Sequence, residues 1–259
     1  RRPCLDVACA PCRESRQDFC TTGRFAERGI KESHGFLTEF AVERAGDLVR
    51  VPSHLADVAV LVEPLTIAEK AMLQLEALDR RHPDGSRGRN AVVLGAGPVG
   101  LLGAMALQAE GYRVWVYSRA VEPNPKADIV RAIGAEYVCS AAVSCEALAG
   151  RIGNIDLIYE AVGVSGISFD LLSVLGLNGV CVFTGIPPMD RSDARDTNGL
   201  MRSLVLKNQL VLGTVNAGPG AFAAAVRDLA DFDRRWPGPL RNLITGRHAI
   251  DDHERLLRG

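Results

Sequence analysis

Hydrophobic positions change their spacing along this chain, and each change predicts a different kind of structure. Residues 1–50 show no amphipathic period. From Ser53 to Leu78 apolar side chains recur at three- and four-residue steps, which predicts helix. Residues 80–90 form a polar connection with proline and glycine, and after it short apolar runs alternate with helical patterns. This connection is the expected domain boundary.

Six strands are expected after the connection, and nearly all of their residues are apolar. The strands are Ala91–Leu94, Arg113–Tyr117, Glu136–Val138, Ile155–Tyr159, Val180–Phe183 and Leu210–Leu212. The expected helices are Pro98–Glu110, Lys126–Ile133, Cys145–Gly150, Gly166–Leu175, Leu200–Lys207 and Ala221–Phe232. Continuous apolar strands are typical of a parallel sheet covered on both faces. Because strand and helix alternate, we predict an α/β fold with a doubly wound parallel sheet.

Composition excludes several classes of protein. The 259 residues include 30 Lys plus Arg and 31 Asp plus Glu, a formal net charge of −1, so charge gives no reason to expect nucleic acid or a membrane as partner. Hydrophobic residues at 47% and charged residues at 24% are ordinary globular values. Residues 91–107 are uncharged, but their glycines and Pro98 would break a membrane-spanning helix.

A glycine-rich loop, Gly95-Ala96-Gly97-Pro98-Val99-Gly100, follows the first of these strands and opens a helix. In a G-x-G-x-x-G dinucleotide site the first glycine forms the turn, the second admits a pyrophosphate, and the third lets helix and strand pack closely. The N–H groups of the first helical turn face the phosphates. The strand before the loop and the helix after it favour cofactor binding at Gly95, Gly97, Pro98, Val99 and Gly100 over a merely tight turn.

The end of the next strand indicates which nucleotide binds. NAD enzymes place a carboxylate there to accept a hydrogen bond from the ribose 2′-hydroxyl. Here the sequence reads Tyr117-Ser118-Arg119, and the first acid is Glu122. Because Ser118 and Arg119 suit a 2′-phosphate, we predict a preference for NADP, with NAD as the alternative. The competing interpretation makes Arg119 a solvated surface charge.

Four of the seven cysteines, Cys4, Cys9, Cys12 and Cys20, follow the spacing C-x4-C-x2-C-x7-C. Four thiolates in a short loop can close a tetrahedral zinc site, which would be structural because no ligand position stays open. Disulfides are the alternative. The sequence shows no secretory segment, so reduced, metal-bound thiols and a cytoplasmic protein are favoured. The isolated Cys139, Cys145 and Cys181 are expected to be ordinary core or surface residues.

Six further segments carry a resemblance to a known family. They are Arg1-Arg2-Pro3-Cys4, Arg16-Gln17-Asp18-Phe19-Cys20, Glu27-Arg28-Gly29-Ile30, His34-Gly35-Phe36, Glu63-Pro64-Leu65 and Glu69-Lys70-Ala71. With them the chain resembles the zinc-dependent medium-chain dehydrogenases/reductases, and most of all the archaeal-type glucose 1-dehydrogenases. The resemblance implies a partial, truncated GroES-like catalytic domain with a cysteine zinc lobe and connecting helix at residues 1–80. It implies a Rossmann domain at 81–235 and a return segment toward the catalytic domain at 236–259.

The resemblance also implies roles for single residues. Glu63 corresponds to a catalytic residue that binds the catalytic zinc directly or through its outer shell, and Glu27 to a carboxylate that binds sugar hydroxyls. Ser118 and Arg119 fall at the 2′-phosphate, and Thr214 and Asn216 at the nicotinamide ribose or the substrate. Each has a plainer alternative: Glu63 could cap a helix, Glu27 could be a surface acid, and Asn216 could stabilise a turn.

Two departures from the family stand out. Four residues separate Cys4 from Cys9, where the family usually has two, so the loop must bulge or Cys4 is a poorer ligand. Family members carry a Cys ligand and an adjacent His-Glu of the catalytic zinc upstream of the cysteine lobe, and nothing in this sequence supplies them. We interpret the five histidines, His34, His54, His82, His248 and His253, as non-ligands, and the chain as truncated at both ends.

The expected activity is oxidation of a glucose-like aldose at C1 to the lactone, with hydride transfer to NADP and with zinc as metal cofactor. One alternative is a catalytically incomplete fragment that binds NADP(H). Another is a polyol, alcohol or threonine dehydrogenase of the same superfamily. The resemblance implies a homo-oligomer, a dimer or a tetramer, with a small-molecule sugar as substrate.

Overall fold

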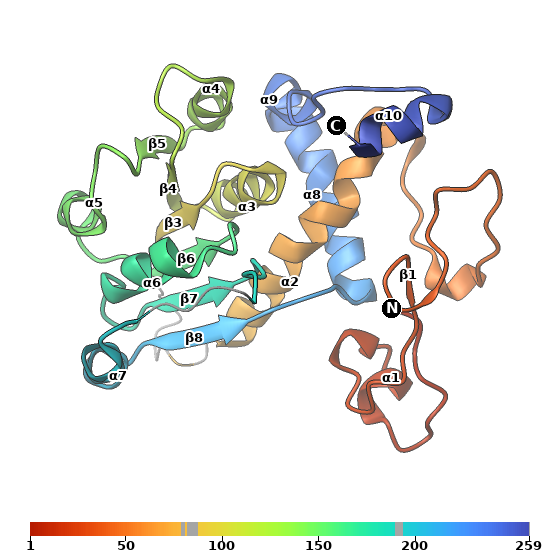
Figure 1. Cartoon of the computed structure of the whole chain (residues 1–259), viewed down its shortest axis with the longest axis horizontal. Coiled ribbons are helices and arrows are strands. Elements are labelled where there is room, and N and C mark those ends of the chain that lie inside the picture. Colours follow the sequence, from red (N-terminus) through yellow and green to blue (C-terminus); the bar gives the residue numbers. More distant parts are fainter. Residues whose placement is uncertain (79–80, 82–87, 190–193, 259) are drawn as a thin grey trace.

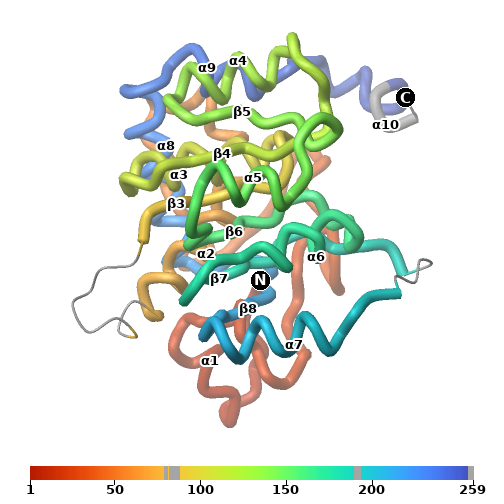
Figure 2. The backbone as a smooth tube through the Cα atoms, turned by 90° about the vertical axis from the view of Figure 1, so that its left-hand side faces the viewer, coloured from red at the N-terminus to blue at the C-terminus, as the bar shows by residue number. Residues whose placement is uncertain are grey.

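A computed structural model describes residues 1–78, 81, 88–189 and 194–258, and it contains one six-stranded parallel sheet. The strands are β3 (Asn90–Leu94), β4 (Arg113–Ser118), β5 (Glu136–Cys139), β6 (Leu157–Glu160), β7 (Val180–Phe183) and β8 (Leu210–Gly213). Their spatial order is β5-β4-β3-β6-β7-β8, and Figure 2 shows these strands one below another in this order, from β5 at the top to β8. The chain leaves β3 in one direction and returns to β6 on its other side, and ligands of such sheets bind at that switch point.

Helices cover both faces of the sheet, as the apolar strands predicted (Figure 1). One face packs against α2 (Val62–Leu78), α3 (Pro98–Ala109), α4 (Pro125–Ala132) and α8 (Pro219–Arg235). The other packs against α5 (Cys145–Ile152), α6 (Ser165–Ser173) and α7 (Thr197–Leu206). Within β3, Ala91 and Val93 point to the first face while Val92 and Leu94 point to the second. The doubly wound fold is thereby confirmed.

The expected strands and helices all form, with shifted ends. The largest strand error is at β6, which was expected over Ile155–Tyr159 and runs from Leu157 to Glu160. Ile155 is buried, but its carbonyl accepts from Gly176 outside the sheet. Glu160 continues the strand although it is a carboxylate, because it is buried with hydrogen-bond partners of its own. None of the described helices is long and apolar enough to cross a membrane.

Residues 1–50, which we call the N-terminal lobe, lie beside α2 and α8 and not on the sheet (Figure 1). The lobe contains short elements that a periodicity cannot predict: α1 (Ala10–Arg13), η1 (Gln17–Phe19), β1 (Glu27–Arg28), β2 (Glu32–Ser33) and η2 (Ala45–Asp47). Its few buried residues are Cys4, Cys9, Gln17 and Asp18. The helix expected from Ser53 to Leu78 begins as the 3-10 helix η3 (Ser53–Leu61) and continues as α2.

Past α8 the chain forms α9 (Pro237–Arg241), η5 (Ile250–Asp252) and α10 (His253–Arg258). The Arg247 guanidinium donates to the backbone carbonyl of Asp57 in η3. Most of the polar connection at residues 80–90, including His82, lies outside the described residues. So do residues 190–193, in the segment that follows β7.

Candidate active site

The glycine loop lies at the carboxyl end of β3, at the switch point of the sheet. Gly95 has φ of +109°, which an L side chain rarely adopts, and a Cβ there would lie 2.5 Å from the Val162 side chain after β6. A Cβ on Gly100 would lie 2.1 Å from the Gly95 carbonyl oxygen. A Cβ on Gly97, by contrast, would meet no described heavy atom within 4 Å. Gly95 and Gly100 thus serve the turn and the packing, whereas Gly97 borders open space.

The start of α3 supplies the donors for that space. Gly97 is the N-cap of α3 and Pro98 its first residue, and no side chain caps the N-terminus. The first N–H groups of a helix have no partner within the helix, so they are available to an anion. A pyrophosphate therefore fits the open side of Gly97, with Val99 on the wall of the neighbouring cleft.

At the end of β4, Ser118 is half-buried and Arg119 is exposed. The nearby acid Glu122 pairs with Arg131 of α4, so its charge is already balanced. Arg119 forms no ion pair with any residue that the structure describes. A free guanidinium beside a hydroxyl, with no unpaired carboxylate on the loop, suits a phosphate on the adenosine ribose.

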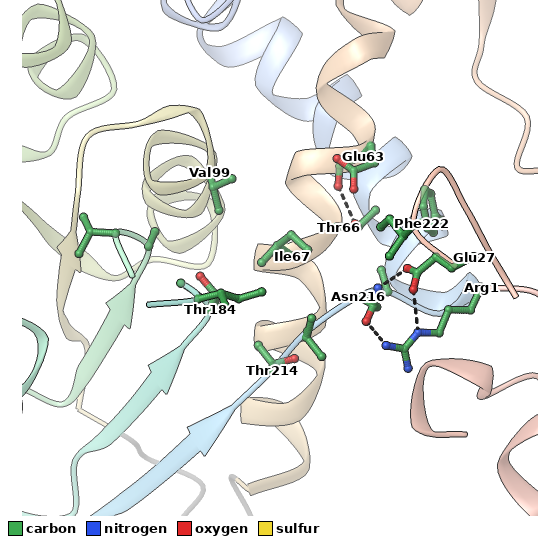
Figure 3. Close-up of a pocket in the computed structure, with 17 residues that line it drawn as sticks. Arg1, Glu27, Glu63, Thr66, Ile67, Val99, Thr184, Thr214, Asn216 and Phe222 are labelled. Atoms are coloured by element: carbon green, nitrogen blue, oxygen red, sulfur yellow. Dashed lines mark hydrogen bonds and ion pairs between the residues drawn. The ribbon is translucent and has the colours of Figure 1, made fainter. Parts of the chain in front are cut away.

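A cleft of about 370 Å³ opens between the carboxyl ends of β6, β7 and β8, helix α2 and the N-terminal lobe (Figure 3). Its polar lining comes from five separate parts of the chain. The polar residues are Arg1, Glu27, Glu63, Thr66, Thr184, Thr214 and Asn216. The structure therefore brings Glu27, Glu63, Thr214 and Asn216, all expected at the site, to one cavity.

Arg1, Glu27 and Asn216 form a closed network on one wall of this cleft (Figure 3). Arg1 Nε lies 3.3 Å from Glu27 Oε2, and Arg1 Nη2 donates to Asn216 Oδ1. The Asn216 amide donates to Glu27 Oε1. Asn216 also has φ of +60°, a conformation that asparagine tolerates better than most residues. The turn-forming and substrate-facing interpretations of Asn216 are therefore compatible.

Glu63 lies apart from that network, in the first turn of α2 (Figure 3). It is exposed, and its backbone carbonyl accepts from Thr66 Oγ1 at 2.6 Å. Its place at a helix N-terminus also fits the capping interpretation. A catalytic zinc needs about three protein ligands. Among the described residues Glu63 belongs to no group of three potential metal ligands, so these residues do not complete a catalytic zinc site.

Glu160 connects two loops that line the cleft. The sequence patterns do not predict this contact. Its Oε1 accepts from the backbone N–H groups of Val162 at 2.9 Å and Gly163 at 2.7 Å. Its Oε2 accepts from Gly185 N at 3.0 Å. The carboxylate therefore joins the loop after β6 to the loop after β7, next to the glycine loop.

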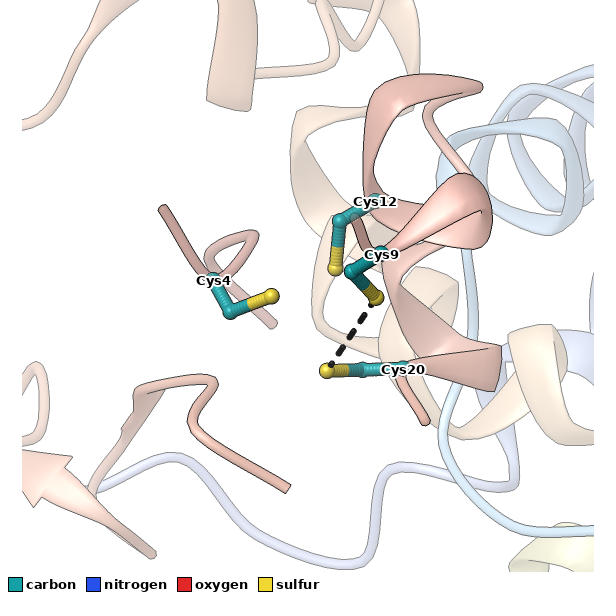
Figure 4. A group of neighbouring side chains, drawn as sticks. All are labelled: Cys4, Cys9, Cys12 and Cys20. Carbon is teal, nitrogen blue, oxygen red and sulfur yellow. Dashed lines mark hydrogen bonds between the residues drawn. The ribbon is translucent and has the colours of Figure 1, made fainter. Parts of the chain in front are cut away.

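The four N-terminal cysteines converge as their spacing predicted (Figure 4). Their Sγ atoms all lie within 4.8 Å of one another, and Cys9 and Cys20 are 3.9 Å apart. A tetrahedron with Zn–S bonds of about 2.3 Å has S–S edges of about 3.8 Å. None of these cysteines is in a disulfide. The cluster therefore fits a zinc ion.

The two extra residues between Cys4 and Cys9 form a turn that points outward. Leu5 and Val7 are 93% and 81% exposed. The turn is held by Asp6, whose carbonyl accepts from Cys9 N at 3.1 Å. Cys4 is consequently not displaced from the cluster by the longer spacing.

Local hydrogen bonds lower the pKa of two of the four thiols. Backbone hydrogen bonds from Cys12 and Thr21 lower the pKa of the Cys9 thiol to about 6. The Thr22 hydroxyl lowers the pKa of Cys20, whereas burial raises the pKa of Cys12 to about 12. Thiolates are the metal-binding form, so Cys9 and Cys20 favour it before any ion arrives.

The remaining sulfur and imidazole groups do not gather. Cys145 and Cys181 are buried in the second face of the sheet and Cys139 is half-buried. No histidine among the described residues belongs to a potential metal cluster.

Comparison with known proteins assigns this chain to a family. The family model described as "Glucose dehydrogenase C-terminus" matches residues 56–258. A glucose 1-dehydrogenase of Methanocella arvoryzae is 36% identical over 259 residues, with 100% of this chain and 71% of the relative covered. One of Metallosphaera sedula is 37% identical over 263 residues, with 100% and 70% covered.

Solved structures give the same result. A crystal structure of glucose dehydrogenase from Haloferax mediterranei superposes with a TM-score of 0.87 at 30% identity, covering 98% of this chain and 71% of that one. A structure from the same organism, in complex with NADP, Zn and gluconolactone, has a TM-score of 0.80 at 30% identity and covers 89% and 64%. The chain thus spans about two thirds of the length of these proteins.

Proposed function

This chain belongs to the glucose 1-dehydrogenase family of zinc-dependent medium-chain dehydrogenases, which are oxidoreductases, and from that premise we propose that it serves NADP-dependent oxidation of a glucose-like aldose at C1 to the lactone. The observation that carries the proposal is that Val99 of the glycine loop lines the same cleft as the network of Glu27 and Asn216. The complex of the Haloferax mediterranei enzyme with NADP, Zn and gluconolactone supports the same pairing of ligands.

The cofactor in this proposal is NADP, with its pyrophosphate at Gly97 and the N-terminus of α3. Arg119, which forms no ion pair with a described residue, and the half-buried Ser118 supply the contacts for the 2′-phosphate. The charge of Glu122 is balanced by Arg131, so no free carboxylate opposes that phosphate. Bound NADP supplies a hydride acceptor for the C1 carbon of the sugar.

The sugar is oriented by Glu27 and Asn216. A carboxylate accepts hydrogen bonds from sugar hydroxyls, and an amide both donates and accepts. Arg1 fixes the direction of the Glu27 carboxylate through the contact at 3.3 Å. Correct placement of C1 is a large part of what such a site contributes to catalysis.

Zinc enters the proposal at the cysteine cluster, where Cys4, Cys9, Cys12 and Cys20 would hold it and stabilise the N-terminal lobe. Reduced thiols at this spacing suit the cytoplasm. Glu63 is proposed to face a catalytic zinc. The described residues do not complete that second site, so we derive no catalytic step through it.

A second candidate function is favoured by the incomplete catalytic zinc site. Because the described residues do not complete a catalytic zinc site, a chain that binds NADP(H) and sugar without turnover is the alternative. The metal content of the purified chain separates the two. Two zinc ions per chain support the enzyme, and one supports the binding module.

The experiment for the cofactor site is a titration of NADPH fluorescence with Gly97→Asp. The new carboxylate would occupy the open space beside the helix N-terminus, so we expect affinity to fall by about 100-fold or more. Gly150→Asp on α5 is the matched control, since a Cβ there also meets no described atom within 4 Å. Unchanged NADPH affinity in Gly97→Asp would refute the site.

We also propose that the chain forms a homo-oligomer through β8. This strand is the last in the sheet order, and its outer edge pairs with no described strand. The neighbouring helix α7 exposes Met201, Val205 and Leu206. An unpaired edge beside exposed apolar side chains is suited to pairing with a second copy.

A further inference from the structure

Lys70 carries a buried positive charge at the junction of the N-terminal lobe with the nucleotide-binding part of the chain. It lies on α2, and its side chain is 7% exposed. The side chain of Asp18, its partner, is 4% exposed. Buried charges are costly unless they are paired and hydrogen-bonded, so a pair at such a position invites a specific explanation.

The Lys70 ammonium contacts three groups from two distant segments. Nζ lies 2.9 Å from Asp18 Oδ2 and 4.3 Å from the centre of the Phe19 ring. It donates to the Val215 carbonyl oxygen at 2.9 Å. One ammonium group thus joins the turn Gln17–Phe19 to the loop 214–217, which follows β8.

The first of these segments is continuous with the cysteine cluster. Asp18 lies in η1, which ends one residue before Cys20. Its backbone carbonyl accepts from Arg1 Nη1 at 3.1 Å, and its Oδ1 is buried without a hydrogen-bond partner among the described groups. A Cβ on Gly218, the N-cap of α8, would lie 2.6 Å from that Oδ1. The glycine therefore lets the carboxylate approach the positive end of α8.

The second segment lines the cleft. Gln74, one helical turn beyond Lys70, donates to Thr214 Oγ1 at 2.9 Å. Helix α2 therefore holds the loop 214–217 at two adjacent positions, Thr214 and Val215. Asn216 is the next residue, and its amide reaches Glu27.

We propose that Lys70 is a positioning residue which, together with Asp18, couples metal binding by the four cysteines to nucleotide binding at the loop 214–217. Metal bound to Cys20 fixes the turn that carries Asp18, Asp18 fixes Lys70, and Lys70 fixes Val215 beside Asn216. The inference rests on the proposed function, because it takes this loop to contact the nicotinamide ribose. By linkage the coupling is reciprocal, so nucleotide must strengthen metal binding by the same factor.

The test measures the dissociation constant of NADPH by fluorescence for the chain with one equivalent of zinc and for the chain stripped by a chelator. In the unmodified chain we expect zinc to tighten NADPH binding about tenfold, within the usual range of coupling between sites. NADPH should raise the affinity for zinc by the same factor, measured by competition with a chromophoric chelator.

The variant for the coupling is the double change Lys70→Met with Asp18→Asn. It removes both charges together, which a buried site tolerates better than the loss of one partner. We expect the ratio of zinc-loaded to zinc-free NADPH affinity to fall to about one. Lys207→Met is the matched control, because Lys207 also donates to a backbone carbonyl, that of Leu175, at 3.2 Å. It should keep the tenfold ratio.

A purely structural pair would shift both NADPH constants equally and leave their ratio unchanged, which overturns the inference. Equal zinc affinity with and without NADPH in the unmodified chain also overturns it, and that measurement needs no variant. If the unmodified chain binds NADPH in neither state, the proposed function fails and the coupling fails with it. Binding of NADPH without coupling leaves the proposed function intact and removes the inference alone.

Discussion

The side-chain amide of Asn216 donates to the Glu27 carboxylate, which joins the loop after β8 to the N-terminal lobe. The two residues are 189 positions apart in the sequence. Arg1 contacts both of them, so the three side chains orient one another. The wall of the cleft that we propose to bind the sugar is therefore assembled from both parts of the chain and depends on how they are held together.

Glu27→Gln should weaken sugar binding about tenfold or more, because hydrogen bonds to a charged acceptor contribute about 1.5–3 kcal/mol. The dissociation constant of NADPH should stay unchanged. Titration of gluconolactone against the NADPH complex measures the first, and direct titration measures the second. Glu32→Gln, at an exposed position of the same lobe, is the control. Equal lactone affinity in Glu27→Gln and the unmodified chain would remove Glu27 from the sugar site.

The sheet could be predicted because its strands are almost uniformly apolar and because glycines mark the turns between strands and helices. Gly111 and Gly134 follow α3 and α4 with φ of +80° and +83°, a conformation that glycine adopts readily at the end of a helix. The N-terminal lobe gave no such pattern, since its helices and strands have two to four residues. Its cysteines nevertheless predicted a cluster, because thiol spacing does not depend on a period.

Arg119→Asp should lower the ratio of NADP to NAD affinity. It removes a guanidinium that can pair with the 2′-phosphate and introduces a charge that repels it, and together these predict a change of about 100-fold. Parallel fluorescence titrations with NADPH and NADH give the ratio. Arg151→Asp, exposed on α5, carries the same charge change away from the loop and should leave the ratio as it was. An unmoved ratio in Arg119→Asp would make this arginine a surface charge.

The cysteine cluster should bind one metal ion per chain, and Cys20→Ser should abolish tight binding. Cobalt substitution offers a direct readout, because tetrahedral thiolate coordination gives charge-transfer absorption in the near ultraviolet. Cys139→Ser removes a half-buried thiol outside the cluster and should keep both stoichiometry and spectrum. Cys4→Ser tests the longer spacing, and a spectrum identical to that of the unmodified chain would exclude Cys4 as a ligand.

The two residues near the site that the sequence patterns did not indicate share a property: their partners come from elsewhere in the chain. Glu160 accepts from the loops after two strands, and Lys70 bridges two segments that the sequence does not associate. A partial signal existed on α2, where Glu69 and Lys70 interrupt the apolar positions Leu65, Ala68 and Leu75. Charges on the buried face of a helix need partners, but a sequence does not say which.

Glu69 should make the chain less stable as pH rises. Burial, and then the charge of Asp228 on α8, raise the pKa of Glu69 to about 8, while Arg227 opposes the shift and Glu110 adds to it. The folded state therefore binds a proton that the unfolded state releases near pH 4, so this destabilisation is absent below that pH and complete above about pH 8. Its upper bound is about 5 kcal/mol.

Chemical denaturation from pH 5 to pH 9 measures this effect. The stability of Glu69→Gln relative to the unmodified chain should rise steadily from pH 5 to pH 9, whereas the relative stability of Glu76→Gln, exposed on the same helix, should not change with pH. A parallel pH dependence for Glu69→Gln and the unmodified chain would show that Glu69 does not titrate in this range.

The edge of the sheet gives the last prediction. Met201 and Val205 lie one turn apart on α7 and are exposed, and β8 beside them has no described partner on its outer side. Burying these side chains against a second copy would remove apolar surface from water and satisfy the strand edge. The double change Met201→Glu with Val205→Glu places charges in that contact and should yield a monomer by analytical ultracentrifugation. Leu48→Glu with Val60→Glu adds the same charges at exposed positions away from the edge and should leave the mass unchanged. A monomeric unmodified chain would show that no such contact forms. An oligomer that survives the α7 changes would show that the contact lies on another surface.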